Sequence, residues 1–420
     1  MPEIPSWVDA QAMELDAAYD AAGRWVSSPA NRVAVPLPPE AIGRRIVIRD
    51  DTLRSGGNTP GVYAGVEKKI RIAEALEKAG VQEAEVGYGS LPDDQAFVRE
   101  YKKRGGRIVC GMHARCWLPS WREDVDGIVD CGADLVNFVG MQGYTMTQAL
   151  HPHLTGEAFL QRMEGCIAYA KGRGLKVGFG TDHPRPGIVS ETIRRAVAAG
   201  LDRWVVYDPR GWFLPQTMAM MVTLVREASQ DKIEVTVHAH DDFGLATAIT
   251  FEGIRAGAMG CDVCINRTGH RCGNAALEQV VVGLEYFFGY RTGIDLGQVA
   301  HLSRLVSALY EVPVPENAPI VGRNMFSYGG LHIPGILRGD WFLWENLRAE
   351  VVGSQRHIVY GPTALQRGAD SPLDAKLAQM GKRADDAEMD RIVSSLKSLF
   401  EEKKFATDAE VERIISRVMG

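Results

Sequence analysis

The sequence lacks the marks of several protein classes. Its 420 residues contain no apolar run near the ~20 residues that a membrane-spanning helix needs. The opening residues, MPEIPSWVDAQAMELD, have no basic start and no apolar core, which argues against a secretory signal and favours a cytoplasmic protein. A formal net charge of -6 and a pI near 6.0 give no general attraction to nucleic acid or to acidic membranes. Low-complexity segments are absent as well.

Cysteine is scarce and its count is odd. Seven cysteines in so long a chain predict reduced thiols and not a disulfide framework. Cys261 and Cys264 form a C-x2-C pattern, but the surrounding CDVCINRTG reads as a buried strand. Their side chains would then point to opposite faces, so we do not expect a zinc site there.

Regular alternation of strand and helix patterns is present instead. Helical patterns such as VEKKIRIAEALEKAG separate eight β-branched, apolar runs, and many close with Ala-Gly, a signal for a helix C-terminus. Alternation of this kind predicts parallel pairing, and eight strands close a (β/α)8 TIM barrel of the α/β class. The predicted strands are 44–50, 83–89, 107–114, 134–140, 176–182, 203–209, 234–240 and 261–267.

Three segments are expected along the chain. Residues 1–43 form an N-terminal extension with one amphipathic helical pattern followed by a Pro-rich link. Residues 44–295 form the barrel. Residues 296–420 are a mostly helical C-terminal subdomain that contains a Gly-rich interruption and ends in two helices.

Polar side chains gather where the predicted strands end. A TIM barrel builds its active site on the carboxyl ends of its strands, so a ring of such residues predicts a site at that face. The alternative is that strand ends are polar in any protein. The residues are Asp50, Asp51, Arg54, Glu85, His113, Arg115, Asp182, His183, Arg185, Asp208, His238, His240 and Asn266.

Two of these residues, His238 and His240, lie one residue apart in VTVHAHDDFGLA. Side chains alternate along a strand, so both imidazoles point the same way. Two imidazoles at a barrel rim suit a divalent metal, while a pair of exposed or stacked histidines is the alternative. If the metal is there, Asp241 and Asp242 are expected to orient the histidines by hydrogen bonds.

Five motifs resemble one superfamily. HAHDDFGLATAITFEGIRAGA resembles the His-x-His-Asn-Asp-x-Gly-x-Ala stretch of the DRE-TIM metallolyases, whose members include isopropylmalate, homocitrate and citramalate synthases and hydroxymethylglutaryl-CoA lyase. INRTGHRCGNAALEQVV, DTLRSGGNTPGV, EVGYGS and GRNMFSYGGLHIPGILRG resemble further motifs of the synthases, in the same order over residues 45–420. The C-terminal segment favours the synthase branch over the lyase.

The resemblance implies a Claisen-type condensation. An α-keto acid would chelate a divalent cation (Mg²⁺, Mn²⁺ or Zn²⁺), which polarises the keto group. Acetyl-CoA or a related acyl-CoA would lose a methyl proton and attack the keto carbon. By position, Arg54 would stabilise the developing negative charge. His332 would match the family's acid/base histidine, which usually comes from the partner subunit and therefore implies a homodimer.

The candidate site follows from both arguments. HARC (113–116) is similar to a homocitrate synthase motif, so Arg115 would hold a distal carboxylate of the substrate, unless it pairs with a neighbouring carboxylate of the barrel. The expected metal ligands are His238, His240, Asp51 and Asn274. The expected catalytic residues are Arg54, His332, Asp182 and Glu85, and the expected substrate-binding residues are His113, Arg115, Arg185 and Asp208.

The sequence also departs from the family pattern. Ser55 replaces the metal-binding aspartate that follows the family's arginine, and a neutral hydroxyl is a poorer ligand for a hard divalent ion. Trp344 aligns with the tyrosine that partners the catalytic histidine, and an indole cannot relay a proton as a phenol does. Three functions therefore stay open: a synthase with an altered keto acid or thioester, a carbon–carbon lyase or aldolase, and a binding protein without turnover.

Overall fold

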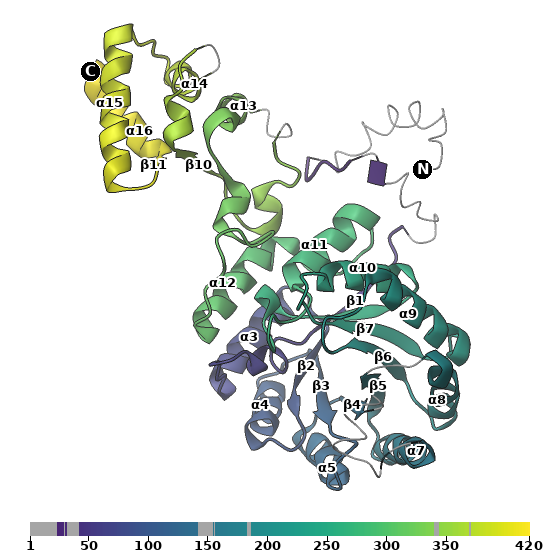
Figure 1. Ribbon diagram of the computed structural model, residues 1–420. Coiled ribbons are helices and arrows are strands. Elements are labelled where there is room, and N and C mark those ends of the chain that lie inside the picture. Colours follow the sequence, from purple (N-terminus) through teal and green to yellow (C-terminus); the bar gives the residue numbers. More distant parts are fainter. Residues whose placement is uncertain are drawn as a thin grey trace, which may run out of the picture. The chain divides into compact units, whose positions relative to one another are not determined.

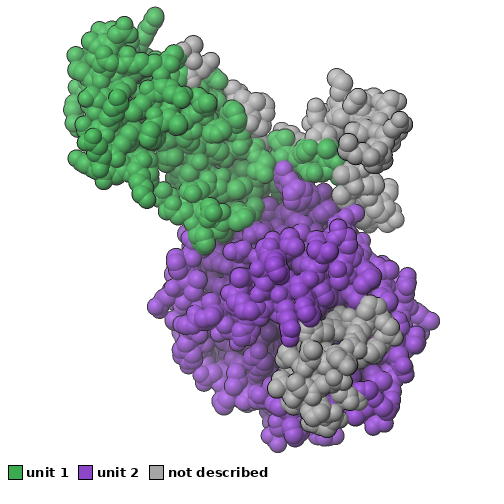
Figure 2. Space-filling view, viewed as in Figure 1, with its two compact units in different colours: residues 1–36, 315–420 green, residues 37–314 purple. Residues whose placement is uncertain are grey.

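The computed structural model describes residues 23–28, 30–31, 42–141, 154, 156–182, 186–339, 344–368 and 371–420. The side chains of residues 141, 182 and 186–188 are outside the described set, as is the predicted helix at the start of the N-terminal extension. The described chain forms two compact units, coloured separately in Figure 2. One is built from residues 37–314, and the other joins residues 1–36 to residues 315–420.

The larger unit is the predicted TIM barrel. Eight parallel strands pair in chain order, and the first pairs with the last to close the sheet, while helices surround it (Figure 1). The fold class expected from the alternation is thereby confirmed. The strands are β1 (Val47–Asp50), β2 (Glu83–Tyr88), β3 (Val109–Ala114), β4 (Leu135–Met141), β5 (Lys176–Asp182), β6 (Arg203–Asp208), β7 (Glu234–Ala239) and β8 (Gly260–Val263).

Amphipathic helices cover the outside of the barrel. Each turns its buried positions towards the strands, as Ile70, Ala73 and Leu76 do on the first of them. The helices are α3 (Val66–Lys78), α4 (Pro92–Lys103), α5 (Trp121–Cys131), α7 (Glu157–Gly172), α8 (Pro186–Ala198), α9 (Pro215–Ser229), α10 (Ala246–Arg255), α11 (Leu277–Phe288) and α12 (Val299–Tyr310). The boundary between units places α12 with the barrel, although the sequence analysis assigned residues from 296 onward to the C-terminal subdomain.

Two glycines of β5 make room inside the barrel for large polar side chains from the strands on either side, β4 and β6. A Cβ atom on Gly178 would lie 2.0 Å from Oδ1 of Asn137, and one on Gly180 would lie 2.5 Å from the ring of Tyr207. Real Cβ atoms do not approach other atoms so closely, so these positions exclude any larger residue. The barrel therefore holds polar groups at its centre where many barrels hold branched aliphatic side chains.

Ion pairs join the amino ends of the barrel strands, where Glu83, Arg203 and Glu234 are the first residues of β2, β6 and β7. The Nη2 atom of Arg203 donates to Oε2 of Glu83 at 2.8 Å, and its Nε donates to Glu234 at 2.9 Å. Lys176 extends the chain of charges with a 2.8 Å bond to the same Glu234. The side chains of Arg203 and Glu83 are 2% and 8% exposed. Removing one member of such a pair leaves an uncompensated charge out of water.

Glu83→Gln is expected to lower the free energy of unfolding by about 3 kcal/mol, because the guanidinium of Arg203 keeps only Glu234 as an anionic partner. Urea unfolding followed by far-UV circular dichroism measures the change.

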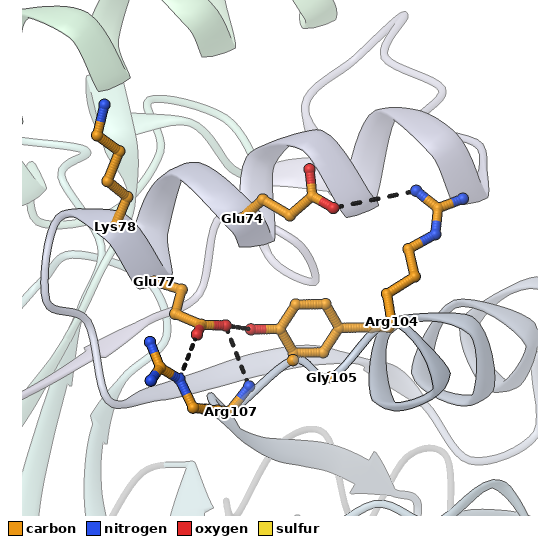
Figure 3. A pocket seen from close by; sticks show the side chains of 8 residues that line it. Glu74, Glu77, Lys78, Arg104, Gly105 and Arg107 are labelled. Carbon is orange, nitrogen blue, oxygen red and sulfur yellow. Dashed lines mark hydrogen bonds and ion pairs between the residues drawn. The ribbon is translucent and has the colours of Figure 1, made fainter.

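Arg107→Ala is the matched control: Arg107 forms an exposed ion pair with Glu77 at 2.7 Å, beside a surface cavity of about 390 Å³ (Figure 3). Exposed pairs contribute roughly 0–1 kcal/mol. Equal losses in the two variants would contradict the expectation.

The smaller unit combines a small mixed sheet with helices. Strand β10 (His357–Tyr360) pairs in parallel with β9 (Ser327–Tyr328) and antiparallel with β11 (Ala406–Thr407). The two helices predicted at the C-terminus are present as α15 (Asp386–Glu402) and α16 (Asp408–Met419), and each begins with a capping box. Two further helices among the described residues of this unit are α13 (Ile333–Arg338) and α14 (Pro372–Gln379). The apolar core of this unit includes Tyr360, Ile392, Leu396, Val411 and Ile415.

None of the seven cysteines forms a disulfide, and only Cys272 is exposed. Among the helices that the structure describes, none combines the length and the apolar character that crossing a bilayer requires.

Candidate active site at the carboxyl ends of the strands

Arg54 joins two of the expected site carboxylates. The turn that follows β1 is held by Asp51, whose carboxylate accepts the amide of Ser55 at 3.2 Å. This turn directs the guanidinium of Arg54 inward, where Nη2 donates to Asp51 Oδ2 at 2.9 Å and to Glu85 Oε2 at 2.7 Å. Both carboxylates are fully buried, and the arginine side chain is 9% exposed. A fixed cation therefore stands at the mouth of the barrel.

Glu85 on β2 accepts two hydrogen bonds and lies against a histidine. Besides Arg54 it accepts the amide of Asn137 at 2.7 Å, and Nε2 of His113 lies 2.8 Å from its Oε2. Although burial disfavours the charged carboxylate, His113 and Arg54 hold the pKa of Glu85 well below its usual range. Burial, together with Arg54, lowers the pKa of His113 to about 4. The two shifts both favour a proton-free carboxylate and imidazole over a protonated pair.

The two histidines of β7 enter the same space. The rings of His238 and His240 lie 5.2 Å apart, and both side chains are buried. His238 lies opposite Tyr207 of β6 in the strand register, with the two rings 5.0 Å apart. Burial, with help from His238 and Arg271, lowers the pKa of His240 to about 2. A neutral imidazole keeps a lone pair for a metal ion, so the donor chemistry suits a cation.

Asn274, in the segment that follows β8, lies next to His240. Its segment pairs with the end of β7 through an isolated bridge to His240 and a 3.0 Å bond from Ala275 to Ala239. The amide nitrogen of Asn274 donates to Ser55 Oγ at 3.0 Å and to the Thr268 carbonyl at 2.9 Å, which leaves its Oδ1 with no partner. Nδ1 of His240 is likewise buried without a partner. Unsatisfied buried polar atoms are costly, and a cation would satisfy the amide oxygen and, in the tautomer with its proton on Nε2, the imidazole nitrogen.

Among the described residues, three buried ligand atoms also lie within 4.8 Å of one another, from Asp51, His238 and Asp262. Nδ1 of His238 is 2.9 Å from Oδ2 of Asp262 and 3.6 Å from Oδ2 of Asp51. Asp262 is also held by Arg49, with two bonds of 2.6 Å. The histidine therefore faces carboxylates on one side of its ring.

The expectation that Asp241 and Asp242 orient the histidines is wrong. Asp241 accepts the amide of Ala246, the first residue of α10, at 2.8 Å and binds Arg267 at 2.9 Å. Asp242 binds Arg271 at 2.6 Å. Consecutive residues after the strand turn away from the barrel axis to begin the next helix. The carboxylate that contacts His238 comes from the neighbouring strand β8 instead.

Two expected substrate-binding residues have structural partners. Arg115 forms two bonds to Asp124 of α5, at 3.0 and 3.1 Å, which is the alternative that the sequence left open. Asp208 accepts the amides of Trp212 and Phe213 at 3.1 Å and so shapes the loop after β6. Burial raises the pKa of Asp208. Their contact with a substrate stays a prediction.

The described structure does not test the positions of the remaining expected residues relative to this site. His332 belongs to the smaller unit, where its ring meets that of Trp344 at 4.3 Å and 75°. An edge-to-face contact therefore replaces the hydrogen bond that a tyrosine would offer. Arg185 and the side chain of Asp182 lie outside the described residues. The roles of all three stay predictions.

Sequence reasoning missed four buried residues next to the site: Arg49, Asn137, Tyr207 and Asp262. Arg49, Tyr207 and Asp262 each come one residue before the end of a strand, and Asn137 lies in the middle of β4, so their positions do not differ in kind from those of His113 and Glu85, which were predicted. A signal did exist for two of them. Arg49 and Asp262 are charged residues in otherwise apolar runs, and a charge is almost never buried unless it has a partner.

The fold and these side chains define a class: a TIM barrel with a buried cluster of carboxylates, histidines and an asparagine at its active-site face. The chain belongs to the HMGL-like family, whose model matches residues 45–306. A protein assigned as the (R)-citramalate synthase CimA of Archaeoglobus fulgidus is 37% identical, over 89% of this chain and 76% of that protein. The homocitrate synthase AksA of Methanothermobacter thermautotrophicus is 32% identical, over 94% and 99%.

A solved structure agrees with the fold. The HMG-CoA lyase from Brucella melitensis superposes with a TM-score of 0.56 at 18% identity, covering 64% of this chain and 100% of that one. The suspected membership of the synthase-containing superfamily is confirmed by the family model and the curated relatives.

Proposed function

We propose that this protein is an acyl-CoA-dependent condensing enzyme that joins an acyl group to an α-keto acid. One observation carries the proposal beyond family membership. His240 and Asn274 each present a buried acceptor without a partner, and Arg54 places a fixed cation on the same face of the barrel. This combination provides ligand atoms for a metal ion and a separate positive charge that can stabilise an oxyanion.

The proposed metal ligands are His238, His240, Asn274 and Asp51. Three are neutral, so the carboxylate of Asp51 supplies the negative charge that hard divalent ions prefer. A bound divalent cation would act as a Lewis acid on the keto carbonyl of the substrate. Ser55 is not needed as a ligand, because its Oγ accepts the amide of Asn274.

The chain's own residues have distinct tasks in the reaction. Arg54 stabilises negative charge that develops on the keto oxygen, and Glu85 with Asp51 fixes the position of its guanidinium. The methyl group of the thioester gives up a proton to a base, its carbon bonds to the keto carbon, and the keto oxygen takes up a proton to become a hydroxyl. Water then cleaves the thioester and releases CoA. His332 is the proposed acid/base group; it would act from a second subunit of a cytoplasmic homodimer.

The names of the relatives differ in their products, so the keto acid must be found by experiment. Release of CoA from acetyl-CoA, measured with a thiol reagent across a panel of α-keto acids, tests the proposal. Each assay is run with Mg²⁺, Mn²⁺ or Zn²⁺ and again with chelator. We expect release with at least one keto acid, abolished by chelator. Release that persists in chelator would contradict the metal assignment, and no release in any assay would contradict the condensation.

Asp51→Asn is expected to weaken binding of Mn²⁺ by at least about tenfold, because an amide oxygen carries no net charge towards the ion. Ser55→Ala is the matched control and is expected to bind Mn²⁺ within about threefold of the original protein. Isothermal titration calorimetry on metal-free protein measures both. The reverse order, with Ser55→Ala the weaker binder, would return the ligand role to the family position.

A further inference from the structure

Arg49 and Asp262 form a closed ion pair beneath the candidate metal site. They are direct neighbours in the register of β1 and β8. Nε of Arg49 donates to Oδ1 of Asp262 and Nη2 donates to Oδ2, each at 2.6 Å. Both side chains are 1% exposed. Such a two-pronged bond uses the carboxylate in its ionised form, which can accept hydrogen bonds and cannot donate them.

His238 completes this arrangement. Its Nδ1 lies 2.9 Å from Oδ2 of Asp262. Because the carboxylate only accepts, the shared proton must be carried by Nδ1. A neutral imidazole has one N–H and one lone pair, so the lone pair is then on Nε2. The pair therefore selects one of the two tautomers of the histidine.

A competing arrangement uses a different set of three side chains. Asp51, His238 and Asp262 together could hold an ion directly, with Nδ1 as the nitrogen ligand. Both oxygens of Asp262 are already bonded to a guanidinium, however, and a dication on this carboxylate would stand next to that positive charge. The charge of Arg49 thus favours Asp262 as a support for the ligand over Asp262 as a ligand.

We propose that Asp262, held by Arg49, is a positioning residue that keeps the proton of His238 on Nδ1 and presents Nε2 to the metal. This inference rests on the metal site of the proposed function. Metal-binding histidines commonly donate their second N–H to a carboxylate, which fixes the ring and raises its basicity. Here the carboxylate is itself fixed by a buried arginine from the adjacent strand.

Nitrogen NMR of the full chain labelled with [¹⁵N]histidine tests the tautomer directly. Ten histidines contribute signals, and the one missing from His238→Gln identifies His238. In metal-free protein at pH 8 we expect Nδ1 to carry the proton. On addition of Zn²⁺ the Nδ1–H signal should persist while Nε2 shifts. A proton on Nε2, or loss of the Nδ1–H signal on adding Zn²⁺, would overturn the proposal in favour of direct binding by Asp262.

Asp262→Asn provides a second test. Its amide offers a donor as well as an acceptor, so the tautomer is no longer fixed, and we expect the Kd for Zn²⁺ to rise about 10- to 100-fold. Asp94→Asn is the matched control: Asp94 is also buried and binds a cation, Lys69, at 2.6 Å, yet does not touch His238. Equal Zn²⁺ affinity in the Asp262 variant and the original protein would overturn the proposal. If the variant does not fold, the NMR result on the original protein still decides.

The outcomes separate this inference from the proposed function. The tautomer is read without substrate or thioester. A protein that condenses substrates but carries the proton on Nε2 retains the proposed function and loses the role of Asp262. A protein with the expected tautomer and Zn²⁺ response but no condensation retains that role and loses the proposed reaction.

Discussion

His240→Ala is expected to remove metal-dependent release of CoA, lowering its rate by at least about 10³-fold. Nδ1 of His240 has no other partner, and the residue is only 7% exposed. Bulk water therefore does not readily take the place of the imidazole as a ligand. Loss of Lewis-acid assistance worth several kcal/mol corresponds to this factor, because each 1.36 kcal/mol changes a rate tenfold. The metal content of purified protein, measured by inductively coupled plasma mass spectrometry, should fall in parallel.

His301→Ala is the control for this experiment. His301 is an exposed histidine of α12 in the barrel unit and lies outside the candidate site. It should keep both metal and activity. The interpretation fails if His240→Ala retains metal and turnover, or if both alanine variants lose activity to the same extent. In the second case the effect would come from general loss of folding.

Arg54→Lys is expected to lower kcat by about 10²–10³-fold while the protein stays folded. One terminal nitrogen of Arg54 binds Asp51 and Glu85 at once, and the planar guanidinium leaves further N–H groups for an oxyanion. A lysine retains the charge but is a point donor on a shorter, more flexible stem. Removing one preorganised oxyanion donor typically costs this much in other acyl-transfer enzymes.

Arg195→Lys is the matched control, because Arg195 also binds two carboxylates, Glu157 and Glu164, but on the outer helices. Steady-state kinetics and thermal melting should be measured for both variants. We expect similar melting temperatures and a large difference in kcat. If Arg54→Lys raised KM and left kcat unchanged, Arg54 would serve substrate binding and not the transition state.

Strand periodicity predicts much of the candidate site. Residues in the strands or just after them, such as Arg54, Glu85 and His113, lie together because the carboxyl ends of parallel barrel strands meet at one face. The same argument put His238 and His240 on one side of β7. It failed for Asp241 and Asp242, because a residue's direction after a strand depends on how the next helix begins.

The missed residues show what periodicity omits. Asp262 is 24 positions from His238 in sequence, and Arg49 is 213 positions from Asp262, so no local pattern relates them. Their contact depends on the strand that closes the barrel, where β8 returns to pair with β1. The residue types alone also left Arg115 between a substrate role and a partner carboxylate, and the position of α5 supplied Asp124.

The sequence by itself determined the (β/α)8 barrel, its active-site face and its family, since local periodicity sets each strand and helix and eight such units close in one way. The tertiary structure decided which buried polar atoms pair and which stay unpaired. In the closed barrel, Nδ1 of His240 and Oδ1 of Asn274 have no partners. The carboxylate of Asp262, in contrast, contacts both Arg49 and His238. Long-range pairing of buried charges depends on register and side-chain direction in three dimensions, and the order of residues along the chain does not contain these explicitly.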